Sequence, residues 1–175
     1  MPECPMTEPD DLPPFSLPPP DVAQVASVVL RMPEHQHLVD NDVSIGWLMR
    51  NDTKHKGNKV ELGSVHDVGA IFQGGFKALG LQLLAGMLGE LPTFLVVLDA
   101  GFWGGASDTE RQALVFHELA HVQQALDRFG APRFDRDGLP VFKVVEHDVS
   151  AFNSEVARFG AWSPDLRAFV AIAQR

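Results

Sequence analysis

The segment from Ser107 to Gly130 constrains the fold more than any other part of the chain. Residues 108–129 contain neither glycine nor proline, so nothing in them interrupts an α-helix. Ser107 and Glu110 have the spacing of a capping box, in which each side chain binds a backbone N–H at the start of a helix. Gly130 then provides a stop signal. The sequence therefore predicts one long helix over this segment.

This predicted helix carries the pattern His-Glu-x-x-His at His117, Glu118 and His121. Side chains four residues apart lie one turn from each other on the same face of a helix, so both imidazoles can bind a single Zn²⁺. Glu118 lies about 100° further round the helix axis. From there it can act as general base on a zinc-bound water without being a ligand itself. We therefore interpret His117 and His121 as metal ligands and Glu118 as the catalytic residue.

Apolar residues surround this motif and indicate that the helix is largely buried. They occupy positions 113–116, 119, 120, 122, 125 and 126. Two imidazoles and a carboxylate need a compensating partner in such a setting, and a metal ion supplies one. The alternative interpretation is a core helix whose histidines make ordinary hydrogen bonds. The cap, the helix and the apolar setting together favour the metal site.

A catalytic zinc usually has three protein ligands and an open fourth position, so a third ligand must come from elsewhere in the chain. The segment 144–160 is the suitable source, because its apolar residues recur at helical spacing and Gly160 can end a helix there. Three side chains on this segment can ligate zinc: His147, Asp148 and Glu155. The periodicity alone does not decide among them.

The other predicted elements follow from periodicity and turn residues. We expect a helix over residues 22–31 capped by Asp21, strands over 43–50 and 59–66 joined as a hairpin, a helix over 67–88 that covers the sheet, and a strand over 93–98. The last strand precedes the motif helix, and we expect it to form the sheet edge along which an extended peptide pairs.

Length and composition set the broad class of protein. A chain of 175 residues fits one domain, which we place at residues 21–175, after a tail at 1–20 that holds eight of the thirteen prolines. A net charge of −9 without a dense basic run argues against binding of nucleic acid. Cys4 is the only cysteine, so a metal site must use histidine and carboxylate. The sequence contains no secretory signal or membrane span, which predicts a cytoplasmic protein.

The chain resembles zincin-type peptidases, and more specifically the phage metallopeptidase family and its SprT-like relatives. The resemblance covers most of the chain after the tail and rests on an ordered series: strand 93–98, Trp103, Glu110-Arg111, His117 to His121, His147-Asp148, Phe152 and residues 158–160. It implies an α+β, zincin-like fold, in which a small and mostly antiparallel sheet packs on the HExxH helix and on a C-terminal helix. It also implies that His147 is the third zinc ligand and that Asp148 caps the helix or orients a ligand. A phage origin would place the protein in the host cytoplasm.

One departure from the zincin pattern concerns the residue that stabilises the oxyanion. Many zincins use a tyrosine, and this chain has none. Arg158 or His66 can supply a donor instead, although we interpret both as structural residues. His35, His37 and His55 lie in polar segments and are expected to be solvated.

These observations predict a zinc-dependent metallopeptidase that hydrolyses peptide bonds of a peptide or protein substrate, with a zinc-bound water activated by Glu118. The alternative is a binding or assembly module in which zinc only stabilises the fold. In that case Glu155 or Asp148 would join three histidines as a fourth ligand and leave no position for water. The sequence does not indicate the cleavage preference, the role of the tail or the oligomeric state.

Overall fold

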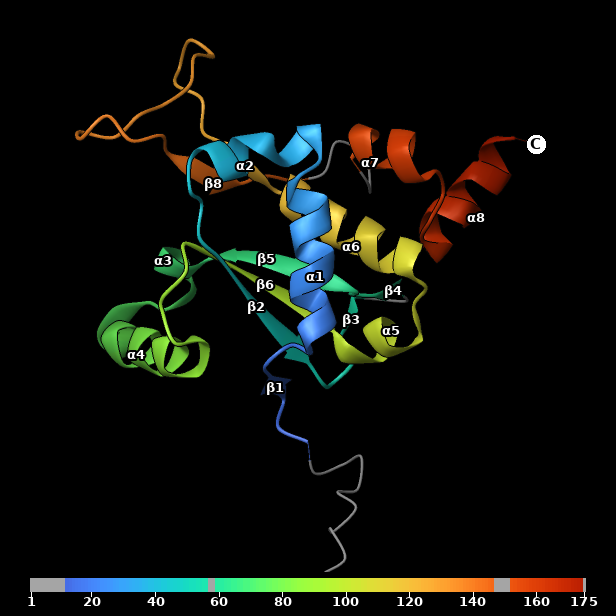
Figure 1. The fold of residues 1–175 in the computed structure, drawn as a ribbon, viewed down its shortest axis with the longest axis horizontal. Helices are drawn as coiled ribbons and strands as arrows, with labels where there is room; N and C mark the ends of the chain where they lie inside the picture. Colours follow the sequence, from blue (N-terminus) through green and yellow to red (C-terminus); the bar gives the residue numbers. More distant parts are fainter. Residues whose placement is uncertain (1–11, 57–58, 147–151, 175) are drawn as a thin grey trace, which may run out of the picture.

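The computed structural model describes residues 12–56, 59–146 and 152–174, and Figure 1 shows their arrangement. The fold is α+β. A four-stranded mixed sheet has the strand order β1-β2-β6-β5, and helices pack on both of its faces. Two smaller two-stranded sheets, β3-β4 and β7-β8, are also formed.

The elements are bounded as follows. The strands are β1 (Phe15–Ser16), β2 (Ile45–Arg50), β3 (His55–Lys56), β4 (Lys59–Val60), β5 (Gly63–Asp67), β6 (Phe94–Asp99), β7 (Val122–Gln124) and β8 (Phe142–Val144). The α-helices are α1 (Pro20–Leu30), α2 (Gln36–Asp40), α3 (Val68–Ile71), α4 (Lys77–Leu88), α5 (Ala100–Gly105), α6 (Asp108–Ala120), α7 (Asn153–Phe159) and α8 (Pro164–Ala173), and the 3-10 helices are η2 (Pro33–His35) and η3 (Gly74–Phe76). In the described part of the chain, no helix is long and apolar enough to cross a membrane.

Strand β6 lies inside the main sheet, between β2 and β5. It pairs in parallel with β2 and antiparallel with β5, where Gly63 is opposite Leu98. The predicted hairpin between residues 43–50 and 59–66 is therefore wrong, because β6 separates these two strands. The β1–β2 pair is antiparallel, so the sheet combines two antiparallel pairings with one parallel pairing.

The prediction that residues 93–98 form a peptide-binding edge is wrong for the same reason. All six residues of β6 are buried, as expected for a strand that has neighbours on both sides and helices on both faces. Among the described strands, the edges of the main sheet are β1 and β5. Strand length and apolar character do not encode which strands become neighbours, so the sequence could not locate the edge.

Helix α6 begins as predicted but is shorter. Ser107 and Glu110 form the predicted capping box, with N–H of Ser107 donating to Oε2 of Glu110 (3.0 Å) and N–H of Glu110 donating to Oγ of Ser107 (3.3 Å). The predicted continuation to Gly130 is wrong, because α6 ends one residue before His121 and the chain then enters β7. The backbone N–H of Val145 donates to the carbonyl of His121 (2.8 Å), and β7 pairs with β8. These long-range backbone bonds replace the next helical turn.

Two other helices also differ from their predictions. The segment 67–88 is divided into α3, η3 and α4, and Gly74 at the break has a φ of +64°, which glycine adopts easily. Asp21 lies inside α1 and does not cap it. Its side chain instead accepts a hydrogen bond from Nε1 of Trp103 (3.1 Å) and pairs with Arg111 (3.3 Å). A long-range contact has therefore taken the place of the predicted cap.

The predicted C-terminal helix is confirmed only in its last part. Helix α7 ends at Gly160 as predicted, and Gly160 has a φ of +65°. At the other end of the segment 144–160, Val144 belongs to β8, and Val145 and Glu146 are not helical. Helix α8 was not predicted from the sequence.

The two hydrophobic cores of the protein lie on opposite faces of the main sheet. One core contains buried side chains of α1 and α6 together with Phe94, Val96 and Leu98 from one face of β6. The other contains Leu84 of α4 and Leu95 from the opposite face of β6. Helix α6 is packed against α1 and contacts β5, which places the His-Glu-x-x-His motif next to the edge of the sheet.

Candidate metal centre

The structure brings the imidazole rings of His117 and His121 together at the C-terminal end of α6. The ring centroids are 5.1 Å apart. His117 lies in the last turn, and His121 is the C-cap, with φ of −67° and ψ of −21°. The backbone is therefore helical through the whole motif, and the spacing expected for residues four apart is kept although the helix is shorter than predicted.

The Nδ1 atom of each ring has a defined partner. Nδ1 of His121 donates to the carbonyl oxygen of Val145 (2.6 Å), and Nδ1 of His117 donates to Oε2 of Glu155 (2.6 Å). A carbonyl oxygen only accepts, so His121 carries its hydrogen on Nδ1 and the lone pair of the neutral ring is on Nε2. Metal-binding histidines show this pattern, in which the nitrogen that does not bind the metal donates to a carboxylate or a carbonyl. The arrangement therefore fits ligation of a metal through Nε2 of both rings.

The surroundings shift the pKa values of the two histidines in opposite directions. Burial lowers the pKa of His121, and the hydrogen bond to Val145 offsets only part of this effect. Burial alone would also lower the pKa of His117, but the hydrogen bond to Glu155 and the charge of Glu118 outweigh it and raise the pKa. The carboxylate of Glu155 thus has a strong influence on the charge of His117.

Glu155 is almost completely buried, with 1 % of its surface exposed. One carboxylate oxygen accepts from His117, and the other accepts from Nε1 of Trp162. Of the three side chains considered as a third ligand, Glu155 is therefore engaged in orienting a histidine, while His147 and Asp148 lie outside the described residues. Trp162 was not predicted from the sequence as part of the site; its one signal was that a buried indole N–H needs an acceptor.

Described residues on either side of the segment 147–151 contact the histidine pair. Val145 binds His121 through its N–H and its carbonyl, and the ring of Phe152 lies against both imidazoles, with centroid distances of 5.5 Å to His117 and 4.8 Å to His121. Within the described ranges, no group of three or more His, Cys, Asp or Glu side chains is placed to hold a metal. The described part of the centre is therefore the histidine pair with its orienting partners.

Glu118 lies beside this pair and is 3 % exposed. Its Oε2 atom has no hydrogen-bond partner in the described part of the chain, and burial raises the pKa of its carboxyl group to about 7. A buried oxygen without a partner is rare in folded proteins, and it fits a site that a water molecule or a cation completes. Gly63 of β5 makes room for this side chain, because a Cβ atom at that position would lie 2.3 Å from Oε1 of Glu118. Gly63 was not predicted from the sequence as part of the site; its signal was a glycine inside a predicted strand.

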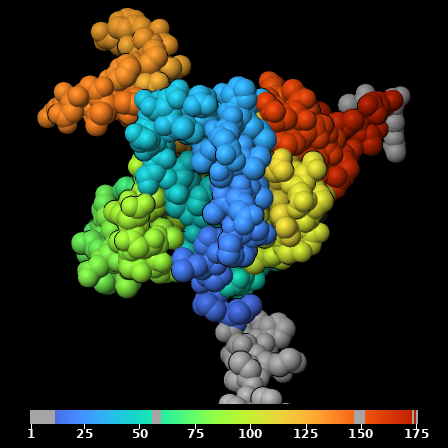
Figure 2. All heavy atoms as spheres, viewed as in Figure 1, coloured from blue at the N-terminus to red at the C-terminus, as the bar shows by residue number. Residues whose placement is uncertain are grey.

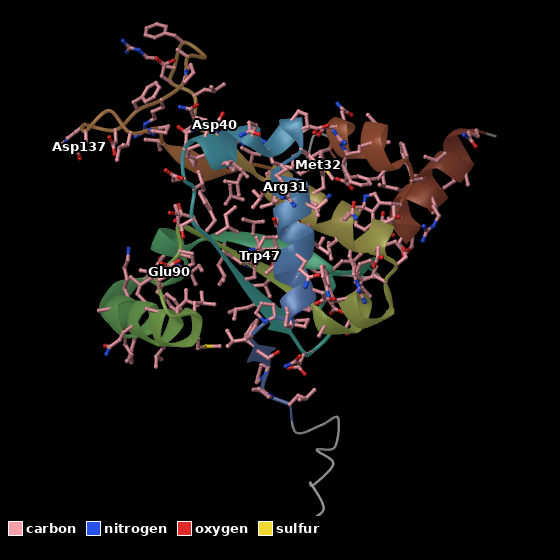
Figure 3. The ribbon with its side chains drawn as sticks, viewed as in Figure 1. Arg31, Met32, Asp40, Trp47, Glu90 and Asp137 are labelled. Carbon is pink, nitrogen blue, oxygen red and sulfur yellow. The ribbon has the colours of Figure 1, made fainter. Side chains whose placement is uncertain are left out.

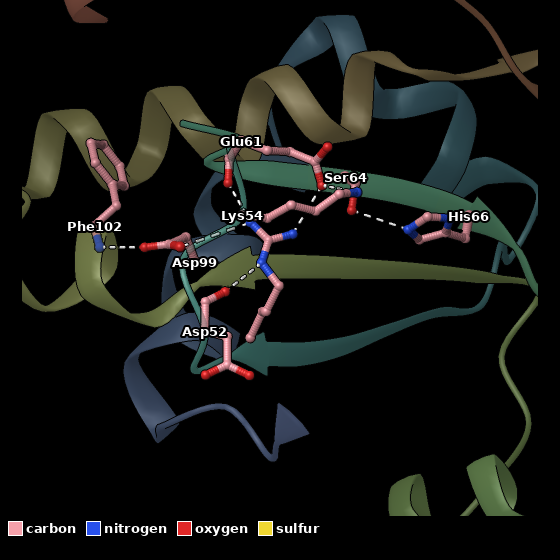
Figure 4. Close-up of polar contacts among 8 residues, drawn as sticks. Asp52, Lys54, Glu61, Ser64, His66, Asp99 and Phe102 are labelled. Carbon is pink, nitrogen blue, oxygen red and sulfur yellow. Dashed lines mark hydrogen bonds and ion pairs between the residues drawn. The ribbon is translucent and has the colours of Figure 1, made fainter. Parts of the chain in front are cut away.

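A buried ion-pair cluster holds the segment that precedes Gly63 against the sheet (Figure 4). Arg50, at the end of β2, pairs with Glu61 (2.9 Å) and lies 3.8 Å from Oδ2 of Asp99, at the end of β6. The guanidinium group also donates to the backbone carbonyls of Asp52 and Glu61. The cluster thereby fixes the chain where it enters β5, at the position next to the motif helix.

Neither side chain considered as an oxyanion donor lies at this centre. Ser64 and His66 are on the face of β5 opposite to Gly63, and Oγ of Ser64 lies 3.0 Å from Nε2 of His66 (Figure 4). Arg158 forms an ion pair with Glu34 (2.7 Å). The structure therefore places both side chains away from the histidine pair.

His35 is buried, which contradicts the prediction that it is solvated. It is 1 % exposed, and its ring lies edge-on against Phe116, with a centroid distance of 4.4 Å. Burial lowers its pKa to about 4. His37 is half-buried and Nε2 of its ring lies 3.1 Å from the carbonyl oxygen of Val122, whereas His55 is exposed as predicted. The polar neighbours of His35 in the sequence did not reveal that η2 packs against α6.

Comparison with known proteins adds one family match. The family model described as "Putative phage metallopeptidase" matches residues 15–174. No curated protein and no solved structure matches the chain. The match covers most of the chain and includes the histidine pair, Glu118, Glu155 and Trp162. The chain therefore belongs to the phage metallopeptidase family.

Proposed function

We propose that this chain is a zinc-dependent metallopeptidase that hydrolyses peptide bonds of a peptide or protein substrate. One observation carries the proposal: the Nδ1 atoms of His117 and His121 are both held by acceptors at 2.6 Å, and the buried Oε2 of Glu118 lies beside them without a hydrogen-bond partner in the described part of the chain. Two oriented imidazoles and a carboxylate are the groups that zinc hydrolases use. Membership of a metallopeptidase family supports the same conclusion.

We assign the metal ligands to His117, His121 and His147. The assignment of His147 is supported by its place in the chain, two residues after Val145, whose backbone binds His121. Glu155 is the weaker choice, because its two carboxylate oxygens are already used by other side chains. A His₃ set is an established ligand set for a catalytic zinc site with an open fourth position.

Glu118 is the proposed general base. When bound, Zn²⁺ supplies a Lewis acid that acidifies a water molecule and polarises the scissile carbonyl. Oε2 of Glu118 accepts the proton from the attacking water, and the protonated carboxyl group then donates it to the leaving amine nitrogen. Burial and the packing of Gly63 hold this carboxylate at one position.

Strand β5 is the proposed docking edge for the substrate. It is one of the two edges of the main sheet among the described strands, and it contacts α6. An extended peptide can add to such an edge through main-chain hydrogen bonds. Pairing along β5 would bring the peptide backbone past Gly63 and therefore close to Glu118.

The test is the zinc content of the purified protein, measured by mass spectrometry beside cleavage of an unfolded protein substrate. We expect one zinc per chain in the wild type and in Glu118→Gln, and none in His121→Ala or His147→Ala. His55→Ala is the control, because His55 is exposed and is not part of the proposed site. Cleavage should be absent in all variants except the control. Absence of zinc after reconstitution of the wild type would refute the proposal.

The alternative function is a module in which zinc only stabilises the fold. It requires a fourth protein ligand, and Glu155 is engaged by His117 and Trp162. Stoichiometric zinc that is lost in both His147→Ala and Asp148→Asn, together with an absence of cleavage in the wild type, would support this alternative.

A further inference from the structure

Residues 125–141 form an arm that connects β7 to β8 and projects from the body of the protein (Figures 1 and 2). The pattern Asp-Arg-x-Gly-x-Pro occurs twice in this arm, at residues 127–132 and 135–140. Figure 3 shows Asp137 in the second copy, away from the main sheet. The arm is therefore built from one short motif used twice, eight residues apart.

The two copies make the same hydrogen bonds. Oδ1 of Asp127 accepts from the N–H groups of residues 129 (2.8 Å) and 131 (3.0 Å), and Oδ1 of Asp135 accepts from those of residues 137 (2.9 Å) and 139 (2.9 Å). Gly130 and Gly138 both have positive φ, +81° and +78°. These side-chain-to-backbone bonds define the turns. N–H of Arg133 also donates to the carbonyl of residue 125 (2.8 Å). The arm thus has a defined backbone instead of an irregular one.

The arm also carries large apolar side chains that are exposed to solvent. Four of them are more than half exposed: Leu126 (56 %), Phe129 (78 %), Phe134 (56 %) and Leu139 (62 %). Scattered single apolar residues are normal on a protein surface, whereas several on one projecting element are a candidate binding surface.

Cationic side chains are interleaved with these apolar ones. The arm contains three arginines (Arg128, Arg133 and Arg136) and three carboxylates (Asp127, Asp135 and Asp137), so its net charge is zero in a chain whose net charge is −9. None of the ion pairs among the described residues involves these three arginines. Asp127 and Asp135, in contrast, each accept two backbone N–H groups within the arm. The arginines can therefore pair with carboxylates of a partner, at a place where the negative charge of the protein is locally balanced.

The arm is attached directly to the candidate metal centre. β7 begins at the residue after His121, β8 ends at the residue before Val145, and β8 contacts β5. A polypeptide that lies on the arm can therefore extend to β5, the edge strand along which we propose that the substrate docks.

We propose that the arm captures an extended segment of the substrate polypeptide that carries both acidic and apolar side chains, and delivers the neighbouring segment to β5. This proposal rests on the proposed peptidase function. Leu126, Phe129, Phe134 and Leu139 bind the apolar side chains of the segment, and Arg128, Arg133 and Arg136 pair with its carboxylates.

The test measures binding, so that it does not depend on cleavage. Glu118→Gln protein is titrated into a fluorescein-labelled peptide of alternating Glu and Leu, and into the matched peptide with Lys in place of Glu, and the anisotropy is followed. We expect the Glu peptide to bind, and the variant Phe129→Ser/Phe134→Ser/Leu139→Ser to weaken this binding by about tenfold or more. Arg128→Glu/Arg136→Glu, which leaves the apolar residues intact, should weaken it to a similar extent.

The matched control is Phe169→Ser/Ile172→Ser on α8, where the two side chains are 60 % and 69 % exposed but lie away from the arm (Figure 1). We expect this variant to bind as the parent does. Unchanged binding in both arm variants, or equal binding of the Lys peptide, would overturn the proposal.

Tighter binding of a labelled single-stranded oligonucleotide than of the Glu peptide would assign the arm to nucleic acid. A dimer that dissociates in the arm variants, seen by size-exclusion chromatography, would assign it to a second copy of the chain. All these binding measurements can be interpreted even if the protein is not a peptidase, because they need neither zinc nor cleavage.

Discussion

At the scale of single residues, Gly63 shows how one backbone position can control the proposed general base. A Cβ atom at Gly63 would lie 2.3 Å from Oε1 and 2.7 Å from Cδ of Glu118, far inside van der Waals contact. The carboxylate must move if a methyl group is added, because Glu118 is itself buried. A shift of about 1 Å in a catalytic group can reduce the rate by about 100-fold.

We therefore expect Gly63→Ala to lower kcat for peptide cleavage by about 100-fold and to leave the zinc content unchanged. Gly86→Ala is the control, because a Cβ atom at Gly86 meets no atom within 4 Å. Steady-state kinetics and metal analysis check the prediction. A parallel loss of zinc and activity would mean that Gly63 supports the whole site and does not act through Glu118.

His35 links the stability of the protein to pH. Burial lowers its pKa from 6.5 to about 4 on folding, and neither ring nitrogen has a hydrogen-bond partner in the described part of the chain. The unfolded chain therefore binds a proton as the pH drops through 6.5, whereas the folded protein does so only near 4. This contribution to stability is fully present above pH 6.5 and is lost as the pH falls from 6.5 to 4, by up to about 3 kcal/mol.

We expect His35→Leu to reduce the loss of unfolding free energy between pH 7.5 and pH 4.5. Urea unfolding at several pH values measures this dependence. His55→Leu, at an exposed position, should behave like the wild type. An unchanged pH dependence in His35→Leu would show that other groups control acid stability.

At the scale of elements, α7 places Glu155 against the motif helix. Helix α7 spans only Asn153–Phe159, and its buried Glu155 holds Nδ1 of His117 while Trp162 holds Glu155. Removal of a hydrogen-bonding partner of a metal-bound histidine typically weakens metal binding by about 10- to 100-fold. The orientation of His117 therefore depends on an element that is distant in sequence.

We expect Glu155→Gln to weaken zinc binding by about 10- to 100-fold and to lower the pKa of His117 in the metal-free protein. Competition with a chelator and an NMR titration measure the two effects. Glu90→Gln is the control, because Glu90 is exposed and lies away from the metal centre (Figure 3). Complete loss of zinc in Glu155→Gln would make Glu155 a ligand.

The first turn of α6 is capped by local interactions. Ser107 and Glu110 satisfy two N–H groups of the first turn, and replacement of such a cap usually costs about 1 kcal/mol. We expect Ser107→Ala to lower the unfolding free energy by about this amount, while Thr109→Ala, at an exposed position of the same helix, changes it less. Urea unfolding compares them, and equal losses would show that the cap adds nothing.

At the scale of the whole molecule, Glu118 of the candidate metal centre and His35 give the stability of the protein opposite pH dependences. Burial raises the pKa of Glu118 from 4.5 to about 7 in the metal-free protein. A carboxyl group with a raised pKa stabilises the fold fully below pH 4.5, and this contribution is lost as the pH rises to 7, by about 3 kcal/mol. The site is therefore unfavourable for stability near neutral pH when no metal is bound.

We expect metal-free Glu118→Gln to be more stable than the metal-free wild type at pH 8, by up to about 3 kcal/mol. The difference should shrink below pH 5, where the wild-type carboxyl group is protonated. Thermal or urea unfolding after treatment with a chelator measures it. Equal unfolding free energies of the metal-free wild type and Glu118→Gln at pH 8 would contradict the inference that Glu118 is a buried charged group at that pH.

The sequence by itself determined the features that depend on neighbouring residues. The capping box at Ser107, the end of α7 at Gly160 and the spacing of His117 and His121 all follow from backbone geometry within one or two helical turns. The positions of β2 and β6 also follow from local apolar patterns. These interactions do not require knowledge of the rest of the fold.

Only the tertiary structure decided the features that depend on distant partners. The end of α6 depends on the backbone hydrogen bond from Val145 to His121, and the sheet order depends on β6 lying between β2 and β5. The roles of Gly63 and Glu155 likewise come from segments that meet α6 in space. The physical reason is the same in each case: burial and long-range hydrogen bonds are set by which segments pack together, and a local sequence pattern carries little information about that packing.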